Sequence, residues 1–453
     1  MIILTLNCGS SSAKFQVYSW EEHEVLSVGK VERIGLDHTQ LIHKGLDRPA
    51  FRKEVDAPTH KEAFERIFEI LVDPEYGVLK SLDEIDAVGH RVLHGGEVFK
   101  RSTIVTDEVI SELKKLIPLG PVHMPANIMG IEICQKLLPS ALQAIILDTA
   151  WHQSLDEVAY LYTLPFEWYQ KYGVRRYGFH GTSYIYCSRR AAALLGKDIK
   201  DCNLIVCHIG NGASINAIRN GVSIDTSMGF TPLEGLVMGT RAGDMDPAIV
   251  TYMEKVLGKT PDQMDAILNT ESGLLGVCGC GGDRRDIQSA ITKGDRMAAL
   301  GANIECHRLK KYIGAYRALL GDVDAIVFTA GVGEEITPIR EGTCRGLEKI
   351  GICMDYEKNR KAKCRNAESC ISTEDSPIKI FVIPTNEELV MTEDVHALAI
   401  GTFNGGDFKY SFEDPNYTDS ARVRAMKEDF LEHPEWKEVL ICPPDARENL
   451  YEI

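Results

Sequence analysis

Ile2-Ile-Leu-Thr-Leu-Asn-Cys-Gly-Ser-Ser-Ser-Ala-Lys14, at the start of the chain, is the stretch around which the rest of the fold is organised. An apolar run, a short Gly/Ser turn and a second run beginning near Ala13 predict a β-hairpin. The turn combines three serines with the amide of Asn7 and the ammonium of Lys14, and such donors suit a phosphate chain. On this stretch alone, a phosphate-binding turn and an ordinary polar hairpin are equally good interpretations.

The same pattern occurs a second time, about half a chain later. Residues 204–218 again read as a strand, a Gly-rich polar turn and a strand, with His208-Ile-Gly-Asn-Gly212 at the turn. Two such hairpins predict a duplicated domain with a ligand held between the copies. The recurrence therefore favours the phosphate interpretation of both turns.

Composition limits the class of protein. The chain has 453 residues, of which 44% are hydrophobic, so we expect two or three domains with ample core. A net charge of -16 argues against nucleic acid as a partner. No apolar run reaches the roughly 18 residues of a membrane helix, and the apolar start lacks a basic leader. The 13 irregularly spaced cysteines indicate reduced thiols in a cytoplasmic protein, with metal binding as a minor alternative.

Candidate site residues follow predicted strands in the first half of the chain. Arg91 lies in the apolar strand that starts at Ala87, where its burial calls for an anion or a structural carboxylate. Asp148 ends the apolar run 144–147, at the strand end where α/β proteins gather ligands; a helix cap is its alternative role. His123 precedes a predicted helix N-terminus, although a structural loop histidine is the commoner case.

The second half of the chain offers further candidates. His180 lies between Gly178 and Gly181, and Arg241 lies in a long irregular segment, 225–247, of a kind that is usually functional. A glycine loop, 330–335, follows the predicted strand 323–329, but such a loop is a weak signal by itself. We also expect one long helix over 296–319, a helix from Thr385 to about Ile400, and a polar appendage over 402–453.

Taken together, these segments resemble the acetate kinase family, part of the sugar kinase/actin-like superfamily. The resemblance covers roughly residues 1–400 in order, and it is carried by Asn7–Lys14, His90–Gly96, Arg176–Ser183, His208–Ser214, Asp225–Pro247, Phe328–Glu334 and Ile383–Glu388. It implies transfer of a phosphoryl group from ATP to acetate, with Mg²⁺ (or Mn²⁺) as cofactor and a homodimeric, cytoplasmic protein. Acetate, acetyl phosphate, ATP and ADP are the implied small-molecule partners.

The resemblance also implies roles for individual residues. Arg91 and Arg241 would bind the carboxylate and the transferring phosphoryl group, and His180 would donate to the transition state. Asp148 is the catalytic acid of the family; a carboxylate nucleophile is already ionised near pH 7, so we favour orientation of Arg91 or of the metal shell over proton abstraction. Asn7 and Glu387 would lie on the Mg²⁺ side, partly through water.

Nucleotide contacts follow in the same way. The resemblance assigns Ser12, Lys14 and the 208–212 turn (His208, Ile209, Gly210, Asn211 and Gly212) to the phosphates. It assigns Asp283, Arg284 and Arg285, with Gly331, Val332, Gly333, Glu334 and Glu335, to adenosine and ribose. The chain departs from the family at Gly281-Gly282, at Arg284 and at Glu335, which leaves its base preference open. The two glycines at 331 and 333 still favour a nucleotide over pyrophosphate as the donor.

The implied acyl pocket has Leu93, Val122, Phe179 and Pro232 as its walls, with His123 as a secondary donor. Leu93 replaces the usual Val and Val122 replaces the usual Leu, so the volume of the pocket hardly changes. One methylene in such a pocket is worth about 1–3 kcal/mol. We therefore expect acetate to be the best substrate and propionate to be tolerated.

The expected fold is α/β, with two duplicated RNase H-like (actin-like ATPase) domains and an active-site cleft between them. We expect the first domain over 1–150, completed by a helix at about 386–401, and the second over 151–385. An actin-like ATPase is the alternative on the same fold, but it would not need Arg91, His180 and Arg241 in glycine-framed segments. A propionate or other short-chain fatty acid kinase is the nearer alternative.

Overall fold

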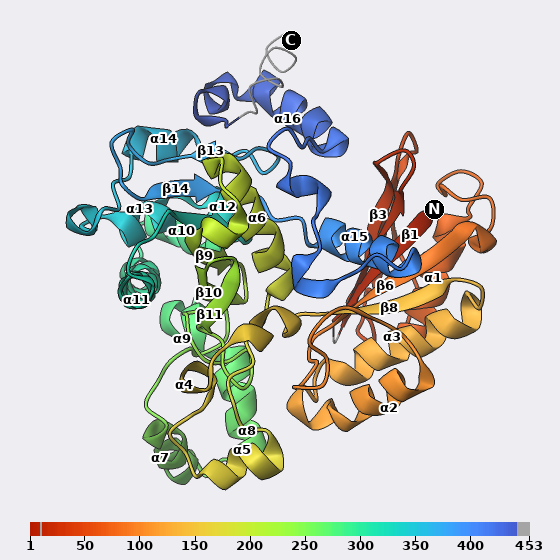
Figure 1. Cartoon of the computed structure of the whole chain (residues 1–453). Helices are drawn as coiled ribbons and strands as arrows, with labels where there is room; N and C mark the ends of the chain where they lie inside the picture. Colours follow the sequence, from red (N-terminus) through yellow and green to blue (C-terminus); the bar gives the residue numbers. More distant parts are fainter. Residues whose placement is uncertain (10, 442–453) are drawn as a thin grey trace. The chain divides into compact units, whose positions relative to one another are not determined.

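The structure is a computed structural model that describes residues 1–9 and 11–441. The chain forms two compact units (Figure 1). Unit 1 comprises Met1–Gln153 and Asn386–Tyr410, and unit 2 comprises Ser154–Thr385 and the described residues from 411 onward. The chain therefore crosses between the units after residues 153, 385 and 410.

Unit 1 is built on a mixed sheet that starts with the predicted hairpin. Strands β1 (Ile2–Cys8) and β2 (Ser12–Ser19) are antiparallel, and β1 is parallel to β6 (Ile85–Val92), which is parallel to β8 (Leu142–Leu147). The strand order is β5-β4-β3-β2-β1-β6-β8-β7, in which the other strands are β3 (Glu24–Glu32), β4 (Gln40–Gly45), β5 (Ala50–Glu54) and β7 (Thr103–Ile104). The first hairpin is thereby confirmed.

Unit 2 repeats this arrangement. Strands β9 (Asn203–Ile209) and β10 (Ala213–Arg219) form the second hairpin, and β9 is parallel to β12 (Ala325–Thr329), which is parallel to β14 (Lys379–Val382). The order is β11-β10-β9-β12-β14-β13, with β11 (Val222–Thr226) antiparallel to β10 and β13 (Ser369–Cys370) at the edge. The order β3-β2-β1-β6-β8 in unit 1 matches β11-β10-β9-β12-β14 in unit 2. The predicted α/β fold with a duplication is therefore confirmed.

Helices cover both faces of the sheet in unit 1. Successive strand residues point to opposite faces, so Leu4 packs with Phe64 of α1 (His60–Leu71), while Ile3 packs with Met391 and Val395 of α15 (Glu387–Ala399). Helix α1 begins with the capping box that its sequence predicts, because the Thr59 hydroxyl accepts a backbone N–H and the Glu62 carboxylate accepts the N–H of Thr59. The other helices of unit 1 are α2 (Asp107–Lys115) and α3 (Met124–Leu137).

Unit 2 carries the remaining α-helices. The expected long helix is confirmed as α11 (Arg296–Leu320). The others are α4 (Glu157–Tyr160), α5 (Phe166–Tyr172), α6 (Gly181–Leu195), α7 (Ala248–Leu257), α8 (Pro261–Ala266), α9 (Gly273–Cys278), α10 (Arg284–Thr292), α12 (Ala330–Glu335), α13 (Thr337–Cys344), α14 (Tyr356–Lys361) and α16 (Ser420–Glu432). One expectation is corrected: the predicted glycine loop 330–335 is the short helix α12.

The segment predicted as one polar appendage is divided between the units. Residues 402–410 belong to unit 1, and the described residues from 411 onward belong to unit 2. Met426 and Phe430 of α16 pack with Cys364 and Ala367 in a small apolar cluster, so this segment contributes to the core of unit 2. The end of the predicted appendage, 442–453, lies outside the described residues.

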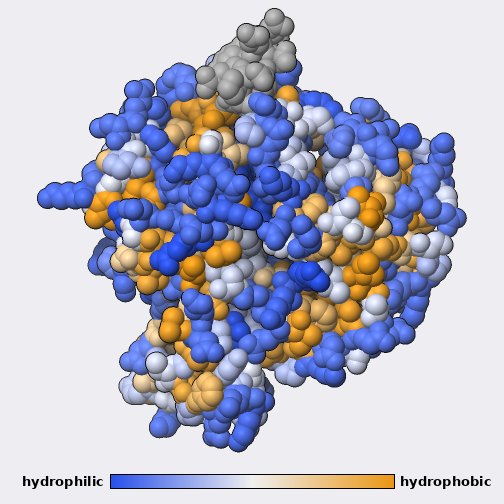
Figure 2. Space-filling view, viewed as in Figure 1, coloured by the Kyte–Doolittle hydropathy of each residue, from blue (hydrophilic) through white to orange (hydrophobic). Residues whose placement is uncertain are grey.

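On the face drawn in Figure 2, hydrophilic side chains cover much of the surface, and hydrophobic ones form patches among them. Among the described residues, every helix is too short or too polar to cross a membrane.

Candidate active site

Four strands of unit 1 bring polar side chains together at the end of the sheet where the parallel strands finish. In the register of the sheet, Asn7 near the end of β1 is paired with Lys14 on β2 and with Arg91 on β6. The next parallel strand, β8, ends at Leu147, and the backbone N–H of Asp148 donates to the carbonyl of Val92. An amide, an ammonium, a guanidinium and a carboxylate therefore gather where parallel strands end, as ligand sites in α/β sheets do.

Arg91 is held by two carboxylates. Its Nε and Nη2 donate to the two oxygens of Asp148 at 2.8 and 2.7 Å, and its Nη1 lies 3.8 Å from a carboxylate oxygen of Glu387. Asp148 is only 1% exposed, whereas 21% of the Arg91 side chain remains exposed. The planar guanidinium fork matches the carboxylate, so Asp148 fixes the direction of the arginine. The alternative of a helix-capping role for Asp148 is replaced by this ion pair.

Glu387 is a partly buried carboxylate of raised pKa. Burial raises its pKa, the charge of Asp148 adds to the rise, and Arg91 and Lys14 oppose it. The pKa of Glu388 is raised for the same first reason, with Glu387 as its charged neighbour. Both residues lie in the first turn of α15, directly after the cap residue Asn386. This corner of unit 1 thus concentrates negative charge next to an arginine.

Sequence reasoning missed a support residue at this edge, Asn127 of α3. Its side-chain oxygen accepts the N–H of Leu93 at 3.0 Å, and its amide donates to the carbonyl of Cys8 at 2.8 Å. Asn127 thereby ties the end of β1 to the segment after β6. The pattern of α3 gave one signal for this role, because Asn127 is a polar residue on a largely apolar helix.

The predicted acyl-pocket residues divide between the units. His123 is the residue directly before α3 and makes no side-chain capping hydrogen bond to it. Val122 beside it is 62% exposed, and Leu93 packs on a core cluster of unit 1. Phe179 and Pro232 belong to unit 2, where Phe179 is 1% exposed.

In unit 2, His180 is fixed by a chain of buried hydroxyls. Its Nδ1 lies 2.8 Å from the Ser214 hydroxyl of β10, which is also bonded to the phenol of Tyr184 on α6. The ring of His180 stacks on His208 at 4.0 Å between centroids. His180 has a φ of +60°, a left-handed backbone conformation that is uncommon for residues other than glycine and recurs at functional sites. Sequence reasoning did not identify Ser214 or Tyr184.

The second-hairpin turn lies beside the two predicted donors of unit 2. A Cβ atom added to Gly212 would lie 3.3 Å from Nη1 of Arg241 and 3.8 Å from Nε2 of His180. Desolvation lowers the pKa of Arg241, which donates to the carbonyl of Pro232 at 3.3 Å. The structure therefore brings Arg241, His180 and the 208–212 turn together within unit 2.

The side chains of the predicted adenosine segment, 283–285, form ion pairs with other side chains of the protein. Asp283 caps α10 and forms an ion pair with Arg285. Arg284 turns inward and bonds Glu305 at 2.6 Å, with side-chain exposures of 5% and 2% for the two residues. Because the guanidinium of Arg284 is buried in this pair, only its backbone remains for the predicted nucleotide contact.

The other predicted adenosine segment is helix α12. Glu335 forms an ion pair with Arg365 at 2.5 Å, and Glu334 is buried, accepting the backbone N–H of Thr385 at 3.2 Å. Burial raises the pKa of Glu334. Gly331 and Gly333 leave room at this helix, since a Cβ atom on Gly333 would meet its nearest neighbour only at 3.5 Å.

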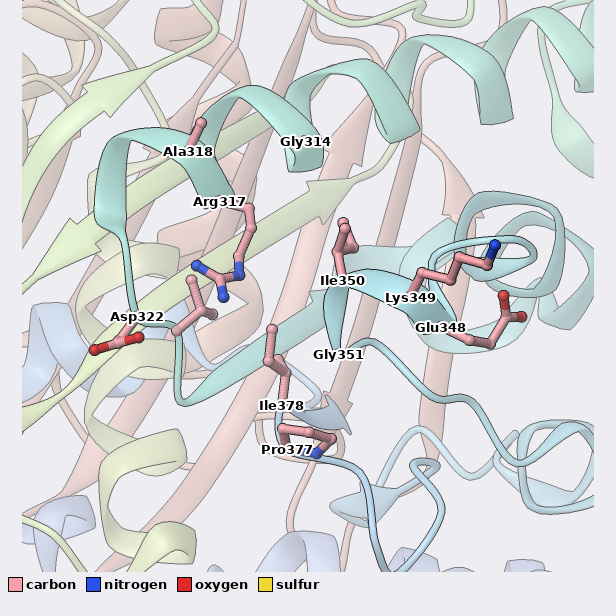
Figure 3. A pocket seen from close by; sticks show the side chains of 11 residues that line it. Gly314, Arg317, Ala318, Asp322, Glu348, Lys349, Ile350, Gly351, Pro377 and Ile378 are labelled. Atoms are coloured by element: carbon pink, nitrogen blue, oxygen red, sulfur yellow. The ribbon is translucent and has the colours of Figure 1, made fainter.

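A separate pocket lies in unit 2 at the amino-terminal ends of β12 and β14. It has a volume of about 960 Å³ and lies where β12 and β14 begin, lined by Arg317, Val323, Ile350, Pro377, Ile378 and their neighbours (Figure 3). None of its lining residues is a predicted site residue. Within residues 1–9 and 11–441, no group of three or more His, Cys, Asp or Glu side chains is arranged to hold a metal ion.

Two sheets of one strand order, each with basic and amide side chains near strand ends, define the class of this protein: an α/β protein with a duplicated fold and polar groups suited to an anionic ligand. Residues 2–393 match the model of the Acetokinase family. The acetate kinase of Geobacter metallireducens is 55% identical over 413 residues, which is 91% of this chain and 98% of that protein. The chain belongs to the Acetokinase family.

Solved structures agree with this assignment. The acetate kinase of Porphyromonas gingivalis matches with a TM-score of 0.83 and 43% identity, over 88% of this chain and 99% of that one. A propionate kinase from Francisella tularensis matches with a TM-score of 0.80 and 39% identity, over 86% of this chain and 97% of that one.

Proposed function

We propose that this protein catalyses the reversible transfer of the γ-phosphoryl group of ATP to acetate, giving acetyl phosphate and ADP. Membership of the Acetokinase family supports the reaction class. The observation that carries the proposal is the Arg91 fork, which is aligned by Asp148 and partly exposed at an edge where parallel strands end. A cation fixed in direction and open to solvent suits a small carboxylate.

The chemistry requires charge neutralisation first. Acetate and the γ-phosphate are both anions, and Arg91 and Arg241 supply the two cations that offset their repulsion. A carboxylate oxygen of acetate attacks the γ-phosphorus in line as the bond to the β–γ bridging oxygen breaks, and ADP leaves with that electron pair. No proton is transferred in this step, because acetate is already ionised.

Asp148 acts through Arg91. Both of its oxygens accept hydrogen bonds from the guanidinium, so they are already engaged in orienting the arginine. This supports an orienting role for Asp148 over removal of a proton from substrate.

His180 acts as a donor to the transferring group. Ser214 has one hydroxyl proton; when Tyr184 donates to Ser214 and Ser214 donates to Nδ1 of His180, the ring proton lies on Nε2. This nitrogen is the ring nitrogen that lies nearer a Cβ atom built on Gly212. An Nε2–H group placed there stabilises charge on the equatorial oxygens of the transition state.

The divalent cation is proposed at Asn7 and Glu387. An amide oxygen and one carboxylate are donors of the kind Mg²⁺ prefers, since it keeps several waters and binds few protein ligands. The partly buried Glu387, whose pKa is raised by desolvation, is a carboxylate whose ionised form a nearby cation would stabilise. When bound, Mg²⁺ (or Mn²⁺) neutralises the phosphate oxygens of the nucleotide.

We propose the nucleotide contacts residue by residue. Lys14 and Ser12 of the first hairpin and His208–Gly212 of the second supply donors for the phosphates, and the segments 283–285 and 331–335 supply the adenosine site. Cytoplasmic location and a homodimer complete the proposal, on the family resemblance alone.

The test is direct detection of the acyl phosphate. Protein, Mg²⁺, ATP and acetate are mixed with hydroxylamine, which converts acetyl phosphate to acetohydroxamate. We expect product that is lost in Arg91→Ala and in Arg241→Ala, while GTP and pyrophosphate are run as alternative donors. A folded protein that binds ATP and forms no hydroxamate with any donor would refute the proposal.

Propionate is the second candidate acceptor. The similarity to a propionate kinase from Francisella tularensis favours it specifically. We propose acetate as the better substrate, because Leu93 adds one methylene to the pocket wall relative to the family and Val122 removes one, so the pocket volume hardly changes. Parallel kinetics with acetate, propionate and butyrate test this, and a higher kcat/KM for butyrate than for acetate would overturn it.

A further inference from the structure

The segment 411–441 lies beyond the match to the family model, although the acetate kinase of Treponema pallidum is similar over 96% of this chain. The family match ends at residue 393, and the Porphyromonas gingivalis acetate kinase is covered over 99% of its length by only 88% of this chain. The segment is nevertheless built into unit 2. Arg190 of α6, 2% exposed, donates to the carbonyls of Phe412 and Asp414 at 2.7 and 3.0 Å and is paired with Glu368.

The side chain of Arg422 in this segment contacts the backbone just before Glu387. Arg422 of α16 donates from Nη1 to the carbonyl of Pro384 at 2.7 Å and from Nη2 to the carbonyl of Thr385 at 2.5 Å. The guanidinium is steadied by Asp419 at 3.8 Å and lies 5.6 Å from the ring of Tyr186. Both arms of the fork are therefore committed to two consecutive backbone carbonyls.

Those carbonyls belong to the crossing between the units. The chain leaves unit 2 after Thr385 and enters unit 1 at Asn386, and Glu387 opens helix α15 two residues after Thr385. The N–H of Thr385 is held in turn by the carboxylate of Glu334 in α12. The backbone at this crossing is therefore hydrogen-bonded both by the guanidinium of Arg422 and by the carboxylate of Glu334, which belongs to the proposed nucleotide segment.

We propose that Arg422 is a positioning residue, which braces the Pro384–Thr385 crossing and so sets the start of α15 and the placement of Glu387. This inference rests on the proposed role of Glu387 at the cation. A backbone carbonyl held by a charged donor is restrained more firmly than one held by water. Residues that orient a ligand of a metal through such contacts change metal affinity when they are replaced.

The first variant is Arg422→Gln, with Arg422→Lys beside it. Gln cannot donate to both carbonyls with a charged fork, whereas Lys keeps the charge but not the planar geometry. We expect the Mg²⁺ activation constant to rise about tenfold in Arg422→Gln, with the KM for acetate within about twofold of wild type. Arg422→Lys is expected to fall between wild type and Arg422→Gln.

Two control variants separate bracing from general loosening of α16. Met426→Ala, one turn further along the same helix, removes buried packing and leaves the fork in place. Arg424→Gln removes an exposed arginine from the same helix. We expect a lower Tm for Met426→Ala with an unchanged Mg²⁺ activation constant, and no change for Arg424→Gln. A rise in the constant for Met426→Ala equal to that for Arg422→Gln would overturn the brace.

A second readout does not depend on activity. Hydrogen exchange of the peptide that covers 384–392, in the full-length protein, is expected to be faster in Arg422→Gln than in wild type and in both controls. Unchanged exchange there would overturn the inference, whatever the kinetics. If wild type forms no acetyl phosphate, the proposed function fails, while the exchange result still decides whether Arg422 holds the crossing.

Discussion

Replacing Asp148 by Asn tests how the guanidinium of Arg91 is aligned. Asp148 is 1% exposed and accepts hydrogen bonds from Nε and Nη2 of Arg91 at 2.8 and 2.7 Å. The asparagine side chain has the same shape but only one acceptor oxygen, and its NH₂ group faces an N–H donor of the guanidinium. One charge-assisted hydrogen bond is lost, and the arginine is left free to turn toward Glu387, 3.8 Å away.

The size of the effect follows from that lost bond. A hydrogen bond to a charged group contributes about 1.5–3 kcal/mol, and each 1.36 kcal/mol changes a rate by roughly tenfold. We therefore expect kcat/KM for acetate to fall by about 10- to 150-fold. Because Asp148 orients and does not take a proton, the pH dependence of kcat is expected to keep its wild-type shape.

The assay is steady-state formation of acetohydroxamate across a pH series with saturating ATP and Mg²⁺. Glu112→Gln, which removes an exposed carboxylate from α2, serves as the matched control and is expected to behave as wild type. An Asp148→Asn variant with wild-type kcat/KM would refute the alignment argument. Loss of one limb of the pH profile, together with a much larger fall in kcat, would instead assign Asp148 as a base.

Three further predictions concern single side chains. Tyr184→Phe removes the phenol that is bonded to Ser214, the hydroxyl beside Nδ1 of His180. We expect kcat to fall about 2- to 12-fold, as for one neutral hydrogen bond of about 0.5–1.5 kcal/mol, with an unchanged KM for ATP; a kcat equal to wild type would contradict this. Glu387→Gln should raise Tm at neutral pH but abolish Mg²⁺-dependent activity. Because burial raises the pKa of Glu387, its charge costs stability above that raised pKa, so the gain in Tm should vanish as the pH falls below the unfolded-state pKa of about 4.3; a gain independent of pH would count against burial as the cause. Gly239→Ala should lower kcat/KM by about tenfold or more, the size of effect expected when site residues are displaced. The added Cβ would lie 1.9 Å from Oδ1 of Asn211, so the 208–212 turn must shift; a fully active variant would show that this turn can move without cost.

Local patterns predicted the elements of both units well. Each hairpin was readable because an apolar run, a Gly/Ser or Gly/Asn turn and a second run lie within about 15 residues, where hairpin signals are strongest. Arg91 and Asp148 were identifiable because each breaks the pattern of a buried strand at its carboxyl end. The prediction of a glycine loop at 330–335 was wrong, because two glycines did not prevent a helix of 6 residues from forming at the end of β12.

Hydrogen-bond partners that lie far apart in the sequence could not be predicted in the same way. Ser214 is an ordinary strand residue in the sequence, and only the pairing of β10 with β9 brings it beside His180 and Tyr184. Arg284 looked like a nucleotide contact in a Gly-rich segment, but packing of α10 on α11 turns its side chain toward Glu305. In both cases burial selected the partner, because a buried polar group must be paired.

The order of residues thus contains the two hairpins, the duplicated fold and the residue types at the strand ends, since these depend on turns and periodicity within short windows. The tertiary structure alone reveals which carboxylate aligns Arg91 and which hydroxyls hold His180. It also reveals that Arg422 donates hydrogen bonds to the carbonyls of Thr385 and Pro384, 37 and 38 residues away. Those choices depend on which groups are buried together. Burial is a property of the packed chain, because a charge or hydroxyl removed from water takes the partner that packing supplies.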